Sequence, residues 1–242
     1  MSGQRIALQD VRFAYRGGRA MQFELDVAAA ERLAVMGPSG SGKSTLIALI
    51  AGFEQPDAGR ILIGEADVTD LPPAARPVTT IFQDNNLFAH LDVRTNVALG
   101  LSPSLRLSRA EWMRIDGALE EVGLADHGAR LPREISGGEA SRAAIARGLV
   151  RDRPVMLLDE PFGALGPSLR QDIIGLIVGL QKRTGTSMVI VTHDPADAAA
   201  VATHLAFLED GRIAARGPVM DMLRGENPAV GRYLGTLGRG AA

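Results

Sequence analysis

Short runs of apolar residues alternate along the chain with longer segments in which apolar positions recur at helical spacing. Such runs predict strands at Ile6–Val11, Met21–Val27, Arg32–Met36, Ile61–Ile63, Val78–Phe82, Val155–Leu158 and Met188–Val191. The runs that begin at Val155 and Met188 are apolar throughout, which is typical of parallel strands buried on both faces. Strands that alternate with helices predict an α/β fold with a mostly parallel sheet.

The strand pattern fades between residues 85 and 135. Ser108 and Glu111 have the spacing of a capping box, in which each side chain satisfies a free backbone N–H of the other residue, and Gly123 suits the end of the helix that follows. We therefore expect a helical subdomain at residues 85–135. The whole chain, residues 1–242, then forms a single domain whose α/β core comprises residues 1–84 and 136–242.

Composition narrows the function classes. The net charge is −2, from 26 basic and 28 acidic residues, which argues against a nucleic-acid partner bound mainly through phosphate attraction. Cysteine is absent, which excludes disulfides and thiolate metal sites. The longest nearly apolar runs, Leu46–Phe53 and Ile173–Leu180, are far shorter than the roughly 20 residues that a membrane span needs. We therefore expect any role at a membrane to depend on a partner.

A glycine-rich segment between the strand Arg32–Met36 and a helix at Leu46–Ala51 carries the strongest chemical signal. Its sequence, Gly-Pro-Ser-Gly-Ser-Gly-Lys-Ser-Thr, matches the phosphate-binding loop pattern in the required context. Glycines allow backbone N–H groups to curl around an anion, and the helix N-terminus adds positive potential. Lys43 supplies a charge to the β and γ phosphates, and the Ser44 hydroxyl can bind Mg²⁺. The expected nucleotide-binding residues are Gly37, Pro38, Ser39, Gly40, Ser41, Gly42, Lys43, Ser44 and Thr45.

Two adjacent carboxylates follow the apolar run Val155–Leu158. Asp159 is placed to hold Mg²⁺ through water, and Glu160 is placed to orient and deprotonate an attacking water molecule. Taken alone, the pair is equally well explained as an ordinary strand end. In combination with a phosphate loop, it indicates a nucleoside triphosphatase.

Four further signals are weaker. Ser136 and Glu139 form a second capping box, and chemistry alone does not decide between a plain capped helix and a phosphate-binding edge. The amide of Gln83 can bind the metal and sense the γ-phosphate, or it can simply be a solvated strand end. His193 can hydrogen-bond the γ-phosphate, although most histidines in loops have no such role. Tyr15 can stack on adenine or belong to the core.

Taken in order, these elements resemble the ATP-binding subunit of the ABC transporters, from about Arg5 to Gly217. Walker A corresponds to Gly37–Thr45, the Q-loop to Gln83, the signature to Ile135–Glu139, Walker B to Val155–Glu160, the D-loop to Gly163–Gly166, the switch histidine to His193 and the adenine-stacking aromatic to Tyr15. A signature placed shortly before Walker B is specific to this family. The resemblance implies a P-loop NTPase (RecA-like) core with an N-terminal antiparallel β portion.

The resemblance also implies a mechanism. Two copies of the chain face each other head to tail as a homodimer, and ATP with Mg²⁺ lies between Walker A of one copy and the signature of the other. The implied signature contacts are Ser136, Gly137, Gly138 and Glu139; the implied catalytic residues are Glu160, His193, Lys43 and Gln83; the implied metal ligands are Ser44, Gln83 and Asp159. The partners are two transmembrane permease subunits, or one fused permease. The chain then lies peripherally on the cytoplasmic face of the inner membrane.

Residues 72–107 show a narrower likeness to the thiamine-import ATPases. Much of it lies in a segment that receives the membrane partner in that family, comprising Asn85, Asn86, Leu87, Phe88 and His90. This likeness implies thiamine uptake together with an extracytoplasmic thiamine-binding protein. It concerns a docking surface and not cargo chemistry, so iron, polyamine, sulfate and molybdate stay open as cargoes. ABC-type ATPases of DNA maintenance or ribosomes carry long coiled coils or two ATPase units, and neither fits one Walker A motif in 242 residues.

The chain departs from the family pattern at two positions. Gly166 stands where the D-loop normally ends in Asp, which removes a carboxylate expected to reach across the dimer. Because of this departure, an alternative function remains open, in which the chain is a scaffold that binds ATP and hydrolyses it weakly. Glu139 stands where the signature usually has Gln, which adds a negative charge beside a phosphate-binding edge. We expect Glu139 to be tolerated with some loss of ATP affinity.

Overall fold

The computed structural model describes residues 2–82, 85–163 and 165–239. In this part of the chain one ten-stranded sheet has the order β5-β4-β1-β2-β10-β9-β3-β8-β7-β6. The strands are β1 Ile6–Ala14, β2 Ala20–Val27, β3 Arg32–Met36, β4 Ala58–Ile63, β5 Ala66–Asp67, β6 Val78–Ile81, β7 Val155–Asp159, β8 Ser187–Val191, β9 His204–Glu209 and β10 Arg212–Pro218. The strands from β9 to β6 pair in parallel, whereas β1 pairs antiparallel with β2 and β4.

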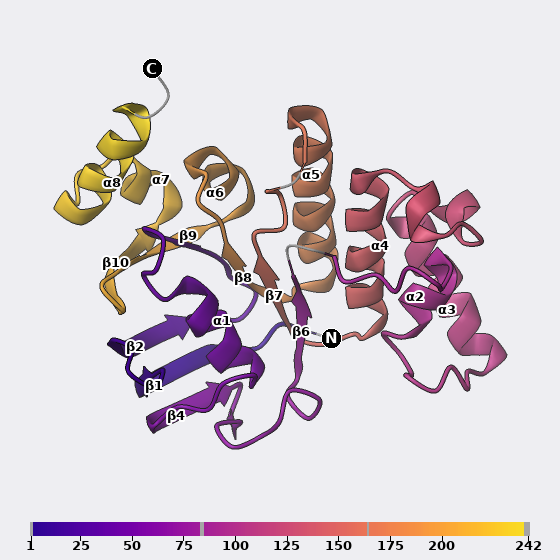
Figure 1. Cartoon of the computed structure of the whole chain (residues 1–242), viewed down its shortest axis with the longest axis horizontal. Coiled ribbons are helices and arrows are strands. Elements are labelled where there is room, and N and C mark those ends of the chain that lie inside the picture. The colour runs from indigo at the N-terminus through magenta and orange to yellow at the C-terminus, as the bar shows by residue number, and fades with distance from the viewer. Residues whose placement is uncertain (1, 83–84, 164, 240–242) are drawn as a thin grey trace.

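Most helices cover the parallel part of the sheet or extend beyond its β6 edge, whereas the last two lie beside β9 and β10 (Figure 1). The helices are α1 Lys43–Ala51, α2 Val93–Ala98, α3 Arg109–Glu121, α4 Gly137–Val150, α5 Pro167–Thr184, α6 Pro195–Val201, α7 Val219–Leu223 and α8 Pro228–Arg239, with short 3₁₀ helices at Ala125–His127 and Pro132–Glu134. No helix among the described residues is both long and apolar enough to cross a membrane.

Alternation along the buried strands divides the core into two clusters. Leu33 and Val35 of β3 face the antiparallel strands and α1, while Ala34 and Met36 face the helices that follow α1 in the chain. All four side chains are buried, because a central parallel strand is covered on both faces. The helix α1 therefore lies between the parallel strands and the antiparallel portion, and it starts at the carboxyl end of β3.

The expected α/β fold with an antiparallel N-terminal portion is confirmed, and the strands predicted from apolar runs are present. The prediction missed the antiparallel pair of β9 and β10 and the long helix α5. The turn between β9 and β10 contains Asp210 and Gly211, both with positive φ. An Asp-Gly pair between apolar runs is a hairpin signal, so the sequence did contain the information needed to find this pair.

Residues 85–135 contain α2, α3 and the two 3₁₀ helices, and α2 and α3 pack against α4 (Figure 1). The predicted capping box at the start of α3 is confirmed. The Ser108 N–H donates to Glu111 Oε2 at 2.7 Å, and the Glu111 N–H donates to Ser108 Oγ at 3.3 Å. The Arg94 guanidinium lies 4.3 Å from the centre of the Trp112 ring and pairs with Asp116, which joins α2 to α3.

A fully buried arginine fixes the carboxyl end of α1. Arg76 donates to the carbonyl oxygens of Leu49 and Ile50 at 2.6 and 3.0 Å, and to those of Thr69 and Leu71 at 2.8 Å. The last carbonyls of a helix have no partner within the helix, and a cation there is favoured by the helix dipole. Burial nevertheless lowers the pKa of Arg76. This residue lies within the segment that resembles the docking region, and its 0% exposure gives it a structural role.

We predict that Arg76→Ala lowers the free energy of unfolding by about 3 kcal/mol or more, because it leaves several buried carbonyl oxygens without a donor. Urea unfolding followed by circular dichroism measures this loss. Arg60→Ala is the matched control, since Arg60 is an exposed arginine on β4, and its change should stay within about 0.5 kcal/mol. Equal stabilities for the two variants would contradict the assignment of Arg76.

Candidate functional site

The loop between β3 and α1 is confined by close backbone packing. A Cβ added to Gly37, which has a φ of +151°, would lie 2.1 Å from the Leu208 carbonyl oxygen on β9. Gly42 caps α1 with a φ of +106° and lies against Met21 and Phe23 of β2. Neither position accepts a side chain, so the glycines bring the loop close to β9 and β2. The Ser41 N–H donates to the Pro38 carbonyl oxygen at 3.2 Å. The Ser41 hydroxyl oxygen is buried with no hydrogen-bond partner among the described residues.

Lys43, the first residue of α1, folds back over this loop. Its Nζ donates to the carbonyl oxygens of Gly37 and Pro38 at 2.8 and 2.9 Å. Burial lowers the pKa of Lys43, while the carboxylates of Glu160 and Asp159 act in the opposite direction. The ammonium group is therefore held in the loop, near two carboxylates at the end of β7.

Asp159 ends β7, and Glu160 follows it in a left-handed conformation with a φ of +47°. The Glu160 N–H donates to the Val191 carbonyl oxygen of β8 at 3.0 Å, which holds this unusual backbone in place. Glu160 Oε2 lies 3.3 Å from His193 Nδ1. Burial raises the pKa of Asp159, and the neighbouring Glu160 charge raises it further. Two of the residues expected to act in catalysis are thus in contact with each other.

The loop that carries His193 is fixed by an ion-pair cluster. Asp194 caps α6 through the Ala196 N–H at 2.8 Å, and its other oxygen accepts from Arg170 of α5 at 2.6 Å. Arg170 also lies 3.6 Å from the buried Asp197. Burial raises the pKa of Asp197, although Arg170 opposes this shift. The cluster therefore links α5, which begins just after the expected D-loop, to the segment after β8.

The expected phosphate-binding loop, Glu160 and Tyr15 border one pocket of about 410 Å³. The lining residues are Tyr15, Arg19, Met21, Ser39, Gly40, Gly42, Lys43, Ser44, Thr45, Glu160 and Gly211. Tyr15 is 47% exposed and meets the Phe13 ring edge-on at 4.8 Å, so it is a surface aromatic and not a core residue. Sequence reasoning missed Arg19, which pairs with Asp210 at 2.7 Å. An exposed arginine in a glycine-rich turn carries no recognisable signal.

The expected signature lies apart from this pocket, at the start of α4. The Ser136 N–H donates to Glu139 Oε2 at 2.6 Å, and the Glu139 N–H donates to Ser136 Oγ at 3.3 Å, so the predicted capping box is present. Gly138 is buried, and a Cβ there would lie 2.9 Å from Leu169 of α5. The structure therefore does not bring Ser136–Glu139 together with the phosphate-binding loop of the same chain.

The described part of the expected docking segment is held by hydrogen bonds from two directions. Arg147 of α4 donates to the carbonyl oxygens of Asn85 and Asn86, each at 2.7 Å, and both asparagines have positive φ. Asn96 of α2 accepts from the Phe88 N–H at 2.7 Å. The Phe88 side chain is 51% exposed and meets His90 edge-on, while Leu87 packs against the core. The segment thus presents an aromatic ring on a rigid turn.

The structure clarifies the setting of one departure from the family pattern. Gly166 occupies the N-cap position of α5 with an extended backbone, and an added Cβ there would meet no atom within 4 Å. The position therefore has room for the aspartate that the resemblance implies, and its glycine leaves α5 without a side-chain cap. Gln83 and Ala164 lie outside the described residues.

Comparison with known proteins decides the family. The family model "ABC transporter" matches residues 20–163. The chain belongs to the ABC transporter family. It is 53% identical over 234 residues to the thiamine import ATP-binding protein ThiQ of Chelativorans sp. (strain BNC1), covering 96% of this chain and 95% of that protein. It is 43% identical to the protein of that name from Escherichia coli (strain UTI89 / UPEC), covering 93% and 96%. Both expected resemblances, to the family and to its thiamine-import members, are confirmed.

A solved structure supports the same assignment. A dimeric ATP-binding cassette in a post-hydrolysis state, bound to ADP and Pi, is 29% identical and aligns with a TM-score of 0.78. The alignment covers 88% of this chain and 98% of that one. The family likeness therefore extends from the sequence motifs to the arrangement of the strands and helices that carry them.

The raised pKa of Asp159 predicts a pH-dependent effect on stability. The native chain keeps this proton to a higher pH than the unfolded chain, so the wild type loses stability as pH rises from about 4 through the raised pKa. Asp159→Asn removes this loss. We expect the variant to gain stability relative to the wild type over this range, by less than about 1.4 kcal/mol for each unit of the pKa shift because solvent partly screens the carboxyl group. Urea unfolding of the nucleotide-free chain at a series of pH values measures it.

Asp26 is the matched control. A hydrogen bond from Arg5 lowers the pKa of Asp26, so Asp26→Asn should lose stability relative to the wild type as the pH rises from this lowered pKa to about 4, and the difference should stay constant at higher pH. This loss should stay below about 1 kcal/mol because the pair is exposed. A pH-independent difference for Asp159→Asn would contradict the prediction.

Proposed function

We propose that this chain is the ATP-hydrolysing subunit of an ABC importer for thiamine. The observation that carries the proposal is 53% identity, over nearly the full length of both chains, to a thiamine import ATP-binding protein. The pocket that joins the phosphate-binding loop to Glu160 supplies the chemistry. We further propose that residues 1–84 and 136–242 form the nucleotide-binding core and that residues 85–135 form the subdomain that meets the membrane partner.

The binding site fits a nucleotide triphosphate with Mg²⁺. The loop lines the pocket with Ser39, Gly40, Gly42 and Lys43, whose backbone N–H groups and ammonium group suit phosphate oxygens. Tyr15 lies at the rim of the same pocket with its ring available for adenine. Ser44 and Asp159, together with Gln83, would hold Mg²⁺ through oxygen atoms, the ligands this ion prefers. When bound, the ion would neutralise charge on the phosphates.

Glu160 is the proposed general base. Its carboxylate lines the phosphate pocket and lies 3.3 Å from His193 Nδ1. In our proposal both groups face the terminal phosphate of a bound nucleotide. A carboxylate there orients a water molecule and accepts its proton as the water attacks phosphorus. His193 then contacts the γ-phosphate, and the Arg170–Asp194 pair holds the histidine loop in position.

A second copy completes the site. Ser136, Gly137, Gly138 and Glu139 lie outside the pocket of their own chain, so in our proposal they contact the nucleotide of a partner chain in a head-to-tail dimer. The relative that is dimeric and bound to ADP and Pi supports a nucleotide-bound dimer. ATP binding favours the closed dimer only to the extent that it binds this state more tightly than the open one, and hydrolysis removes that preference.

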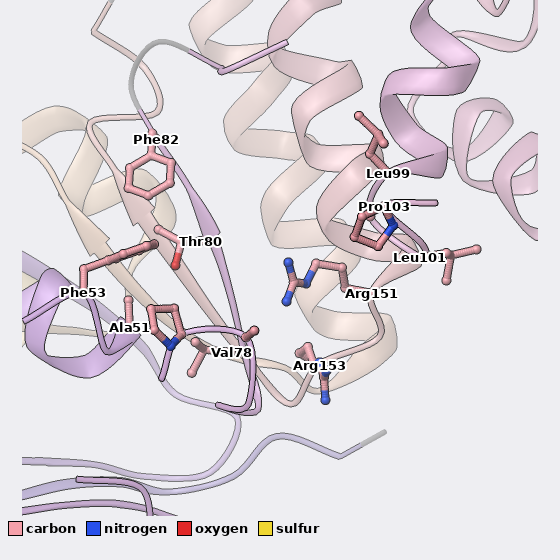
Figure 2. A pocket seen from close by; sticks show the side chains of 13 residues that line it. Ala51, Phe53, Val78, Thr80, Phe82, Leu99, Leu101, Pro103, Arg151 and Arg153 are labelled. Carbon is pink, nitrogen blue, oxygen red and sulfur yellow. The ribbon is translucent and has the colours of Figure 1, made fainter. Parts of the chain in front are cut away.

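A second pocket, of about 430 Å³, supports a docking site for the membrane partner (Figure 2). Phe53 and Phe82 form one side of it, and the loop after α2, from Leu99 to Pro103, forms another. Arg151 extends into the space between these walls, close to Arg153 (Figure 2).

Neither of these two guanidinium groups has an ion-pair partner in the described part of the chain. Burial lowers the pKa of Arg151, and the charge of Arg153 lowers it further. An apolar segment that carries a carboxylate would satisfy both walls of the pocket. We therefore propose that the permease inserts an acidic cytoplasmic segment here, beside Phe88 and its neighbours, and that the chain lies peripherally on the cytoplasmic face of the inner membrane.

The docking proposal predicts a charge effect. Arg153→Glu should reduce co-purification with the permease at least about tenfold, because the new carboxylate would repel the carboxylate of the permease segment in the pocket. Nucleotide binding by the isolated chain should not change, since Arg153 does not line the pocket of the phosphate-binding loop. Arg60→Glu, on exposed β4, is the matched control and should leave co-purification intact. Normal assembly of the Arg153 variant would exclude this pocket as the docking site.

ATP hydrolysis by the complex from its native membrane tests the function itself. With the soluble binding protein present, thiamine should raise the hydrolysis rate severalfold, while iron, polyamines, sulfate and molybdate should not. Stimulation by one of the latter would transfer the proposal to that cargo. Hydrolysis that no cargo stimulates would contradict coupled import. Bound nucleotide without hydrolysis would favour the scaffold alternative, for which Gly166 is the physical reason.

The Glu160→Gln complex is the control for this experiment. The amide keeps the shape of the side chain but cannot accept the proton, so hydrolysis should fall by at least about 10²-fold while ATP still binds. The variant should also accumulate as an ATP-bound dimer. Normal hydrolysis by this variant would show that the measured ATPase activity does not come from Glu160.

A further inference from the structure

Glu139 places a negative charge at the start of α4, where the helix exposes free backbone N–H groups. The N–H groups of Gly137 and Gly138 have no acceptor among the described residues, as expected for the first turn of a helix. The Ser136 N–H donates to the Glu139 side chain, and this hydrogen bond lowers the pKa of Glu139, so the side chain is a carboxylate at neutral pH. A carboxylate so close to an anion-binding edge repels a phosphate unless its charge is held elsewhere.

His127 contacts this carboxylate. Its Nε2 lies 3.0 Å from Glu139 Oε1, while Oε2 is already occupied by the Ser136 N–H at 2.6 Å. Both oxygens of Glu139 are therefore engaged at positions away from the Gly137 and Gly138 N–H groups. The two side chains are mostly covered, with 22% of His127 and 30% of Glu139 exposed, so solvent screens the contact only partly. Arg130 is the other cation that acts on Glu139.

The backbone around His127 is fixed independently of Glu139. The His127 N–H donates to the Leu124 carbonyl oxygen, and its own carbonyl oxygen accepts from Arg130, both at 3.0 Å. The next residue, Gly128, accepts from the Arg94 N–H of α2 at 2.9 Å. The buried Nδ1 atom has no hydrogen-bond partner in the described part of the chain. Among the residues that the structure describes, the single polar contact of the imidazole is thus the one with Glu139.

We propose that His127 is a positioning residue for the ATP-binding edge of α4. By donating from Nε2 it holds the Glu139 carboxylate against the capping box and away from the Gly137 and Gly138 N–H groups. The Gly137 and Gly138 N–H groups then remain available to the terminal phosphate of ATP bound by a second copy. This inference rests on the proposed function, and it assigns to His127 a role that no motif indicates: it allows this chain to carry Glu where the signature usually has Gln.

Steady-state ATP hydrolysis by the intact complex tests the role of His127 through a double-variant cycle with Glu139→Gln. His127→Ala should raise KM for ATP about fivefold, the effect of losing one hydrogen bond, and change kcat less than twofold. His127→Gln, whose Nε2 can reach the same oxygen, should restore most of the affinity. In the Glu139→Gln background, His127→Ala should leave KM unchanged because no charge needs to be held.

Three results would overturn the inference. The first is an unchanged KM in His127→Ala. The second is an equal rise in KM with and without Glu139→Gln, which would indicate a purely structural role. The third is a failure of His127→Gln to restore affinity although thermal unfolding shows that this variant is folded. If the wild-type complex hydrolyses ATP and any of these holds, only the inference fails. If the wild-type complex neither binds nor hydrolyses ATP, the proposed function itself fails.

Discussion

The tight turn from β3 to α1 is the constraint on which the rest of the structure depends. An anion site made of backbone N–H groups works only if the chain holds a turn that few residues can adopt, and here neighbouring strands hold it. The Gly211 N–H, in the turn between β9 and β10, donates to the Ser41 carbonyl oxygen, and the Gln22 N–H of β2 donates to the Gly211 carbonyl oxygen. The parallel and antiparallel parts of the sheet therefore join at the phosphate-binding loop, with β10 beside β2.

Features formed by residues that are close in the sequence could be predicted, whereas those formed by distant residues could not. Strand, glycine turn and helix are contiguous between Arg32 and Ala51, so a local pattern was enough to find them, and the same holds for both capping boxes. Glu31 shows the opposite case. It is buried and pairs with Arg216 at 2.6 Å, across 185 residues of sequence. Only the fold brings such a pair together, and the same is true of His127 with Glu139 and of Arg76 with the end of α1.

The charged groups at the nucleotide site lower the stability of the nucleotide-free chain. Burial shifts the pKa of Lys43 downward and that of Asp159 upward, so the surroundings disfavour the charged form of each group. A site built for a charged ligand has this property, because ions that are partly desolvated before the ligand arrives interact with it strongly afterwards. The strained backbone of Glu160 belongs to the same pattern.

The helix α4 offers a mechanical connection between the two proposed contact surfaces. Its 14 residues form a rod of about 21 Å. The nucleotide edge, with Glu139, lies at its start, and Arg151 of the proposed docking pocket follows its end. Near that end Arg147 donates hydrogen bonds to the carbonyl oxygens of Asn85 and Asn86 in the docking segment.

A helix transmits displacement along its axis because its hydrogen bonds resist stretching, whereas a loop would absorb the same movement. The His127 segment adds a second connection, since α2 holds it at Gly128 and its imidazole holds Glu139. A shift imposed at the pocket by a membrane partner would therefore reach both the backbone and the carboxylate of the signature. In the proposed dimer, the two states needed for coupling would then differ in whether Gly137 and Gly138 meet the nucleotide of the second copy.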